Sequence, residues 1–246
     1  MIMSMRARPG LMTALSAVLA ALLLLTSHWH LAGHIVPGTS MYGLPATERV
    51  ALLGDSILAS AELPSPADHF DAQLAGALRI DPTRVLDDAV SGLSLTGAHP
   101  NLVDRAPAYL AALNPSDVVV LGIGMNDACA AGFSLAAFTS AYAALVGQAQ
   151  ALGLRLLVGQ VTPVAPALWA CEVPRQQIDA WIWATYPHGI VLRYPDVLAS
   201  PGVTWIDPAK VTTDGKHPNE LGTAQMATLT AGVILGPVVV HAARPR

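Results

Sequence analysis

Charged residues are scarce in this chain. Only 12% of its 246 residues are Asp, Glu, Lys or Arg, the formal net charge is −4, and lysine occurs only as Lys210 and Lys216. With 53% hydrophobic residues the chain has ample material for a core, so it is not of the disordered class. It has no basic patch or arginine-rich stripe, which argues against nucleic acid as a partner.

Motifs for nucleotides and metals are missing as well. No G-x-x-x-x-G-K-[ST] or G-x-G-x-x-G sequence follows an apolar run, so nucleotide binding is not indicated. His28, His30 and His34 are close in sequence, but no carboxylate or cysteine stands near them. We therefore expect neither a metal nor a cofactor.

The N-terminus has the features of a targeting segment. Arg6 and Arg8 precede an uncharged run over residues 11–26, which is long for the core of a signal peptide and short for a spanning helix. The arginines should keep the N-terminus in the cytoplasm and send the rest across the membrane. We expect residues 1–33 to be a cleaved signal peptide or an uncleaved anchor. The domain is then exported (periplasmic, extracellular or anchored facing outward), with membrane contact only if the segment is uncleaved.

Residues 34–47 contain proline and glycine and show no sustained period, which is typical of a linker. The expected domain covers residues 48–246, where short apolar runs alternate with longer helical patterns. Strands are predicted at 49–53, within 84–90, and at 117–121, 154–161 and 189–193. Helices are predicted at 67–78, 102–113, 134–152, 174–186 and 219–235, the first opened by Ser65-Pro66, the third capped by Ser134 and the last by Asn219.

The predicted strands are continuous apolar runs, as in parallel strands that are covered on both faces. Their alternation with helices predicts a doubly wound, three-layer α/β sandwich with a five-stranded parallel sheet. In such sheets the functional site lies at the carboxyl ends of the strands. The loops that follow the predicted strands, and the loop before the last helix, are therefore the places to search.

Three strand-end loops carry residues suited to acyl transfer. Ser56 follows glycine and aspartate directly after the first strand, where it could serve as a nucleophile. Gly92 would let its backbone N–H approach a ligand without a Cβ in the way. Asn126 offers a side-chain N–H donor, whereas we expect Asp127 beside it to cap a helix or stabilise a turn.

The loop before the last helix supplies the remaining groups. Asp214 stands three residues before His217, so within one turn of the chain it could accept the Nδ1–H and leave Nε2 facing a serine. Together the four loops hold a nucleophile, a base, an orienting carboxylate and oxyanion donors, which is the full set that acyl transfer requires.

In these residues the sequence resembles the SGNH hydrolases, also called GDSL esterases and lipases. The matching blocks are Gly54-Asp55-Ser56, Gly92, Gly124-Met125-Asn126-Asp127 and Asp214-Gly215-Lys216-His217, in the expected order within residues 48–236. The resemblance implies a flavodoxin-like sandwich with Ser56, Asp214 and His217 as the triad. It also implies an oxyanion hole made by the backbone N–H groups of Ser56 and Gly92 and by the Asn126 side chain.

One position departs from the family pattern, because Asp87 stands where many members have asparagine. The α/β-hydrolases are disfavoured, since no G-x-S-x-G occurs and the serine follows the first strand.

Cys129 and Cys171 both fall near the carboxyl edge of neighbouring strands. We therefore expect a disulfide that braces the oxyanion loop, with two separate thiols as the alternative.

The predicted function is a serine esterase that hydrolyses carboxylic esters. Short acyl or acetyl groups are favoured because the connection between the second and third blocks leaves little room for a lid. The substrate is a small acyl ester, a glycan or a lipid, and residues 162–173 are expected to shape the acyl pocket. Two alternatives use the same site, a glycan O-acetylesterase and an acyltransferase, and a third is a membrane-anchored binding protein without activity. Four tryptophans could stack on sugars, line the pocket or simply pack in the core: Trp169, Trp181, Trp183 and Trp205.

Overall fold

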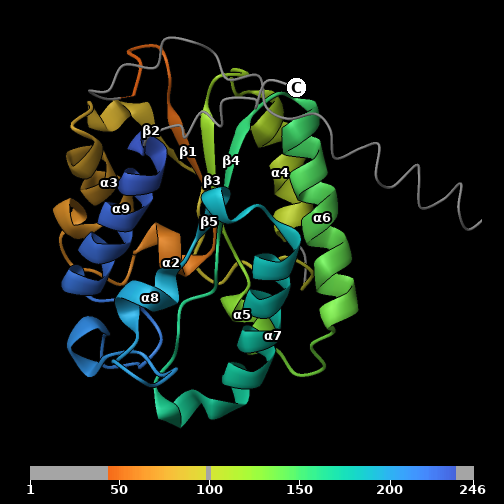
Figure 1. Cartoon of the computed structure of the whole chain (residues 1–246), viewed down its shortest axis with the longest axis vertical. Coiled ribbons are helices and arrows are strands. Elements are labelled where there is room, and N and C mark those ends of the chain that lie inside the picture. Colours follow the sequence, from red (N-terminus) through yellow and green to blue (C-terminus); the bar gives the residue numbers. More distant parts are fainter. Residues whose placement is uncertain (1–43, 98–100, 237–246) are drawn as a thin grey trace, which may run out of the picture. The chain divides into compact units, whose positions relative to one another are not determined.

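Figure 1 shows the computed structural model of the chain, which describes residues 44–97 and 101–236. These residues belong to one compact unit. The predicted signal peptide or anchor, most of the predicted linker and the three neighbouring histidines lie outside the described residues. Within the described ranges, no helix is both long and apolar enough to cross a membrane.

Five parallel strands in the described part of the chain form one sheet, in the order β2-β1-β3-β4-β5. Nearly every residue of β1 and β3 is buried, because helices cover both faces of the sheet. The predicted five-stranded parallel sandwich is therefore confirmed. The strands are β1 (Val50–Gly54), β2 (Val85–Asp87), β3 (Val118–Gly122), β4 (Arg155–Gly159) and β5 (Val191–Leu192).

Long helices form the two outer layers (Figure 1). α3 (Phe70–Leu78) and α9 (Glu220–Leu235) cover one face, while α4 (Leu102–Ala111) and α6 (Leu135–Ala151) cover the other, where α7 (Trp169–Thr185) packs beside α6. Three short helices follow the carboxyl ends of strands: α2 (Ser56–Ala59), α5 (Met125–Ala128) and α8 (Tyr194–Leu198). Single 3₁₀ turns are η1 (Pro66–Asp68), η2 (Pro82–Arg84), η3 (Pro166–Leu168), η4 (His188–Ile190) and η5 (Pro208–Lys210).

Helix caps follow the sequence signals in two places and depart from them in one. Ser134 and Asn219 accept hydrogen bonds from backbone N–H groups in the first turns of α6 and α9, as predicted. The helix predicted from residue 67 instead begins at Phe70. His69, between η1 and α3, is extended, and its ring bonds to the Leu63 carbonyl at 3.1 Å.

Helix α7 begins at Trp169, five residues before the predicted start at Pro174. Proline usually marks a first turn, but here Pro174 lies inside the helix. The turn before it is held from both sides, by a disulfide at Cys171 and by the ion pair between Glu172 and Arg175. A tertiary link, the disulfide, and an ion pair within the helix thus override the local signal, and residues 169–173 are helix instead of the predicted loop.

The described chain is packed against the sheet from its first residue. Leu44 is buried, and the Arg84 guanidinium donates to the carbonyls of Leu44, Pro45 and Glu48. These bonds fix the segment that leads into β1, and the packed chain therefore extends a few residues upstream of position 48.

Candidate active site

The register of the sheet brings three of the predicted loops together. Gly54 at the end of β1 pairs with Gly122 at the end of β3, and the backbone N–H of Asp55 still donates to the Gly122 carbonyl, at 3.2 Å. On the other side, the N–H of Val90 donates to the Gly54 carbonyl, at 3.0 Å. The loops that carry Ser56, Gly92 and Asn126 therefore leave the sheet side by side.

Asp55 ties two of these loops to each other. Its carboxylate accepts the N–H of Ile57 in α2, at 3.0 Å, and the N–H of Met125 in α5, at 3.3 Å. Burial raises the pKa of Asp55 to about 6, although these backbone hydrogen bonds favour the ionised form. The aspartate of the Gly-Asp-Ser sequence is thus a cap of α2 and also a brace between the serine and asparagine loops.

Ser56 is the first residue of α2 and lies against His217. The distance from Ser56 Oγ to His217 Nε2 is 2.8 Å, which is a hydrogen bond. The two residues are only 3% and 7% exposed. As the first residue of the helix, Ser56 also has a backbone N–H without an acceptor inside the helix.

Asp214 holds the other ring nitrogen of His217. Asp214 Oδ2 hydrogen-bonds His217 Nδ1, while Oδ1 accepts the N–H groups of Lys216 and His217 at 2.8 and 3.0 Å and the Thr212 hydroxyl at 2.7 Å. Desolvation raises the pKa of Asp214 and is the largest single cause. The four hydrogen bonds together outweigh it and hold that pKa well below its usual range.

The loop around Asp214 closes on itself. The N–H of Thr212 donates to the His217 carbonyl at 2.8 Å, and the N–H of Gly215 donates to the Thr212 carbonyl at 3.1 Å. Gly215 has a φ of +72°, and a Cβ there would come within 2.7 Å of the Ala165 side chain. Only glycine suits this position, so the loop packs directly against the segment that follows β4.

Asn126 and Gly92 meet at the next loop. Asn126 Nδ2 donates to the carbonyl of Leu93, at 2.8 Å, directly beside Gly92. One of the two Nδ2 hydrogens is thereby used, and the other remains for a ligand. Gly92 has a φ of +80°, and no heavy atom lies within 4 Å of where its Cβ would be, so the space over its backbone is open.

Asp127 stabilises the loop that follows Gly92, as predicted for a turn carboxylate. It is buried and accepts the N–H groups of Leu95 and Thr96, at 2.8 and 3.0 Å. A cavity of about 470 Å³ opens beside this loop and is lined by Gly92, Asn126 and residues 130–134, among others. None of its described lining residues comes from 162–173, the segment that we expected to shape a pocket.

The predicted disulfide is present. Cys129, at the end of α5, is bonded to Cys171 in the first turns of α7, and no other cysteine occurs. Because Asn126 belongs to α5, the bond attaches the loop that carries Asn126 to the long helix α7.

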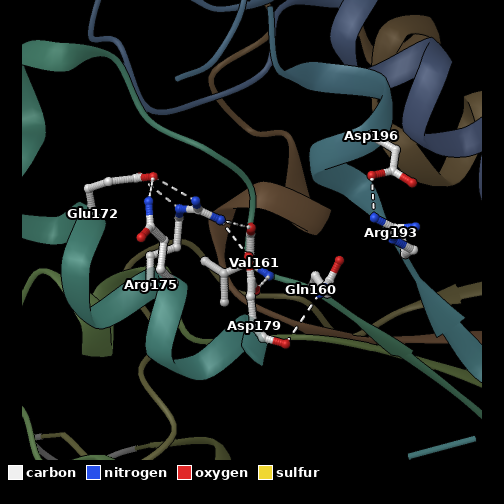
Figure 2. Close-up of polar contacts among 8 residues, drawn as sticks. Gln160, Val161, Glu172, Arg175, Asp179, Arg193 and Asp196 are labelled. Carbon is white, nitrogen blue, oxygen red and sulfur yellow. Dashed lines mark hydrogen bonds and ion pairs between the residues drawn. The ribbon is translucent and has the colours of Figure 1, made fainter. Parts of the chain in front are cut away.

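A buried ionic network makes a second attachment to α7 (Figure 2). Asp179 accepts the N–H of Val161 at 2.7 Å, Arg175 donates to the Val161 carbonyl at 3.2 Å, and Arg175 is also bonded to Glu172. Burial, the largest cause, outweighs the attraction of Arg175 and raises the pKa of Asp179 to about 7. The clamped Val161 packs against Gly124, whose Cβ would lie 3.0 Å from the valine methyl group, so the network supports the residue that precedes α5.

A second carboxylate faces His217. Glu62 Oε1 lies 3.4 Å from His217 Nε2, on the side of the ring that also faces Ser56. The Glu62 side chain is 32% exposed, so it connects this ring nitrogen to solvent. The imidazole therefore has a carboxylate at each nitrogen.

The structure thus brings Ser56, His217 and Asp214 into one hydrogen-bonded chain and places Gly92 and Asn126 together on the neighbouring loop. Asp87, the departing position, ends β2 and accepts the N–H of Ala89 within its own turn, at 2.9 Å. Among the described residues, no group of three or more His, Cys, Asp or Glu side chains could hold a metal ion.

Sequence reasoning missed two residues of the site, Thr212 and Glu62. Thr212 stands two residues before Asp214, so its hydroxyl is close to the carboxylate in sequence, and this nearness is the signal that could have found it. Glu62 belongs to no motif, and only the folded turn places it at the histidine.

Comparison with known proteins identifies a family whose model covers most of the chain. The model of the GDSL-like lipase/acylhydrolase family matches residues 52–225. Among curated proteins, none matches the chain.

Solved structures share the fold at low sequence identity. A member of the lipolytic protein G-D-S-L family from Veillonella parvula is 17% identical and gives a TM-score of 0.63, covering 77% of this chain and 100% of that one. A carbohydrate acetylesterase from Sinorhizobium meliloti is 17% identical with a TM-score of 0.58, covering 76% and 98%. The aryl esterase of M. smegmatis is 18% identical with a TM-score of 0.57, covering 76% and 98%.

Proposed function

The chain belongs to the GDSL-like lipase/acylhydrolase family, and we propose that it is a serine esterase in which Ser56 is the nucleophile, His217 the general base and Asp214 the orienting carboxylate. The observation that carries the proposal is the continuous hydrogen-bonded chain from Ser56 Oγ through both nitrogens of His217 to Asp214 Oδ2. A serine held in this way has a base within reach of its proton and a fixed base orientation.

In the acylation half-reaction, Ser56 Oγ attacks the acyl carbon of the ester while His217 Nε2 takes the hydroxyl proton. The carbonyl oxygen becomes an oxyanion that accepts hydrogen bonds from the N–H groups of Ser56 and Gly92 and from the Asn126 side chain. The tetrahedral intermediate then collapses, the bond to the alcohol oxygen breaks, and Nε2 returns its proton to that oxygen. An acyl-serine and a free alcohol result.

Deacylation repeats these steps with water. His217 Nε2 takes a proton from the water as its oxygen attacks the acyl carbon, and the second intermediate collapses to a carboxylic acid and the restored Ser56 hydroxyl. Asp214 accepts the Nδ1–H throughout and stabilises the imidazolium. Its depressed pKa keeps this carboxylate ionised over the whole working pH range.

For the substrate we propose esters of short acyl groups, acetyl above all, with a glycan O-acetyl ester as the main alternative. The cavity of about 470 Å³ beside Gly92 and Asn126 has the size of a small-molecule site. Two proteins of the same fold are named as a carbohydrate acetylesterase and an aryl esterase, which supports small acyl esters.

The tryptophans differ in whether their side chains are packed or exposed to a ligand. Trp181 packs edge-on against Tyr142 and Tyr186, and Trp183 stacks on His188, so packing explains both. Trp169 is 70% exposed, four residues after the Ala165 that packs against the Asp214 loop. We propose Trp169 as the aromatic side chain with access to a bound substrate.

The proposal is tested by turnover of p-nitrophenyl acetate, propionate, butyrate and octanoate by the wild type and by Ser56→Ala and His217→Ala. We expect turnover that falls with acyl length and a loss of at least about a thousandfold in each variant. Wild-type activity in Ser56→Ala would refute the nucleophile. Product analysis with added alcohols distinguishes hydrolysis from transfer, because a transferase would form the new ester in preference to the free acid.

We also propose that the domain is exported. The proposal rests on the uncharged run behind Arg6 and Arg8 and on the Cys129–Cys171 disulfide, a bond that oxidising compartments maintain. Residues 1–47 fused to alkaline phosphatase, which is active only after export, should give an active reporter. A reporter that stays inactive would refute export, and the size of the mature chain distinguishes cleavage from anchoring.

A further inference from the structure

Glu62 is placed by a strained turn instead of a flexible loop. Helix α2 ends after one turn at Ser60, which has a left-handed φ of +51° although it is not glycine. The Leu63 N–H donates to the Ser60 carbonyl at 3.0 Å, and the Leu63 side chain is buried. The left-handed conformation is unfavourable for serine, so it persists because the surrounding contacts hold it.

The far end of the turn is held as well. His69 bonds the Leu63 carbonyl at 3.1 Å. The backbone on both sides of Glu62 is therefore fixed, and from it the side chain extends to within 3.4 Å of His217 Nε2.

The carboxylate has no bond to make while the enzyme is at rest. The Asp214 carboxylate can only accept, so His217 Nδ1 is the donor to it, and in the neutral imidazole Nε2 then carries the lone pair that accepts the Ser56 hydroxyl. Ionised Glu62 can only accept hydrogen bonds, and a lone pair at 3.4 Å offers it none. Among the described residues, Glu62 has no other hydrogen-bond or ion-pair contact.

The position next to Nε2 is where the alcohol half of the ester must lie. Nε2 hands its proton to the departing oxygen, so that oxygen comes within about 3 Å of Nε2. Glu62 Oε1 lies 3.4 Å from the same nitrogen and faces solvent. A hydroxyl on the carbon next to the ester oxygen therefore comes within reach of the Glu62 carboxylate.

From this juxtaposition we propose that Glu62 is a specificity-determining residue that accepts a hydrogen bond from a hydroxyl adjacent to the ester oxygen. The inference rests on the proposed function. It names the alcohol half of the substrate: a sugar or another polyol that keeps a free hydroxyl beside the acylated one. Alcohols that carry an anionic group at that position are excluded, because two negative charges would face each other there.

The test compares the wild type and Glu62 variants on two esters, one with and one without the neighbouring hydroxyl. Cyclohexyl acetate and the same ester with a hydroxyl on the neighbouring ring carbon differ only in the group that Glu62 would bind. We expect the wild type to prefer the hydroxylated ester by about tenfold or more in kcat/KM, since a hydrogen bond to a charged acceptor contributes about 1.5–3 kcal/mol. Glu62→Ala should use both esters equally, and Glu62→Asp should give an intermediate preference.

Asp68→Asn is the matched control, because it removes the same charge from the same segment at a side chain that does not contact His217. It should keep the wild-type preference. The inference is overturned if the wild type shows no preference, or if Glu62→Ala lowers both rates by the same factor. In the second case Glu62 acts on His217 and does not recognise substrate.

Different results would refute this inference and the proposed function. A wild type that turns over p-nitrophenyl acetate through Ser56 but ignores the added hydroxyl refutes only the role of Glu62. A Ser56→Ala variant with wild-type turnover refutes the proposed function itself.

Discussion

His217 Nε2 lies 2.8 Å from Ser56 Oγ, although the two residues have a sequence separation of 161. The doubly wound topology produces this contact. Ser56 begins the helix after β1, and His217 lies in the loop that leads into α9, which packs beside α3 on the same face of the sheet. Both loops end at the carboxyl edge of the strands, where open α/β sheets place their sites.

Thr212 fixes the carboxylate that orients His217, so its hydroxyl should matter for catalysis. Thr212→Val removes the 2.7 Å hydrogen bond to Asp214 Oδ1 while keeping the shape of the side chain. We expect kcat/KM to fall about fivefold, since such a bond contributes about 1 kcal/mol. Thr213→Val, at the exposed neighbour, is the control and should leave kcat/KM unchanged. Equal rates for the two variants would argue against a role for Thr212.

Asn126 should act on the rate more than on binding. Asn126→Asp keeps the size of the side chain but replaces its N–H donors with acceptors. We expect kcat to fall about 10²–10³-fold with little change in KM, because the lost bond strengthens only as the oxyanion forms. Asn114→Asp, before β3 and away from the carboxyl edge, should behave as the wild type. A change in KM alone would show that Asn126 binds substrate and does not stabilise the oxyanion.

The Cys129–Cys171 disulfide closes a long loop, because its two cysteines have a sequence separation of 42. Replacing both cysteines by serine should lower the free energy of unfolding by about 2–4 kcal/mol, measured by urea denaturation. Since the bond also holds α5, kcat should fall more than KM rises. Unchanged stability together with unchanged kcat would mean that the bond does not brace the oxyanion loop.

Asp179 should make stability depend on pH. Its pKa is raised to about 7 by burial, so the folded state binds a proton that the unfolded chain releases near pH 4. The stability that this group contributes is complete at low pH and is lost as pH rises through about 7. Between about pH 5 and pH 8 the unfolding free energy of the wild type should therefore fall by about 1–2 kcal/mol more than that of Asp179→Asn. Parallel pH curves for the two proteins would contradict the raised pKa.

Much of the site could be predicted because it follows from strand ends. Ser56, Gly92 and Asn126 follow directly after continuous apolar runs, and the parallel topology then brings their loops together. Asp214 and His217 are close in sequence, so their contact needed only one tight loop.

The remainder depended on contacts that no local pattern encodes. Glu62 reaches His217 only because Ser60 adopts a left-handed conformation that serine does not favour. The early start of α7 depends on a disulfide and an ion pair that overcome the usual meaning of Pro174. In both cases tertiary packing decides against the local preference.

The most direct test of the account is to find the acyl group on the enzyme. The protein is mixed with p-nitrophenyl acetate, quenched in acid during the first turnovers, digested and analysed by mass spectrometry. We expect an added acetyl mass on the peptide that contains Ser56, with more of it retained in His217→Ala after slow acylation, because deacylation needs the same base. Continued turnover with no acyl group on that peptide would show that Ser56 is not the nucleophile.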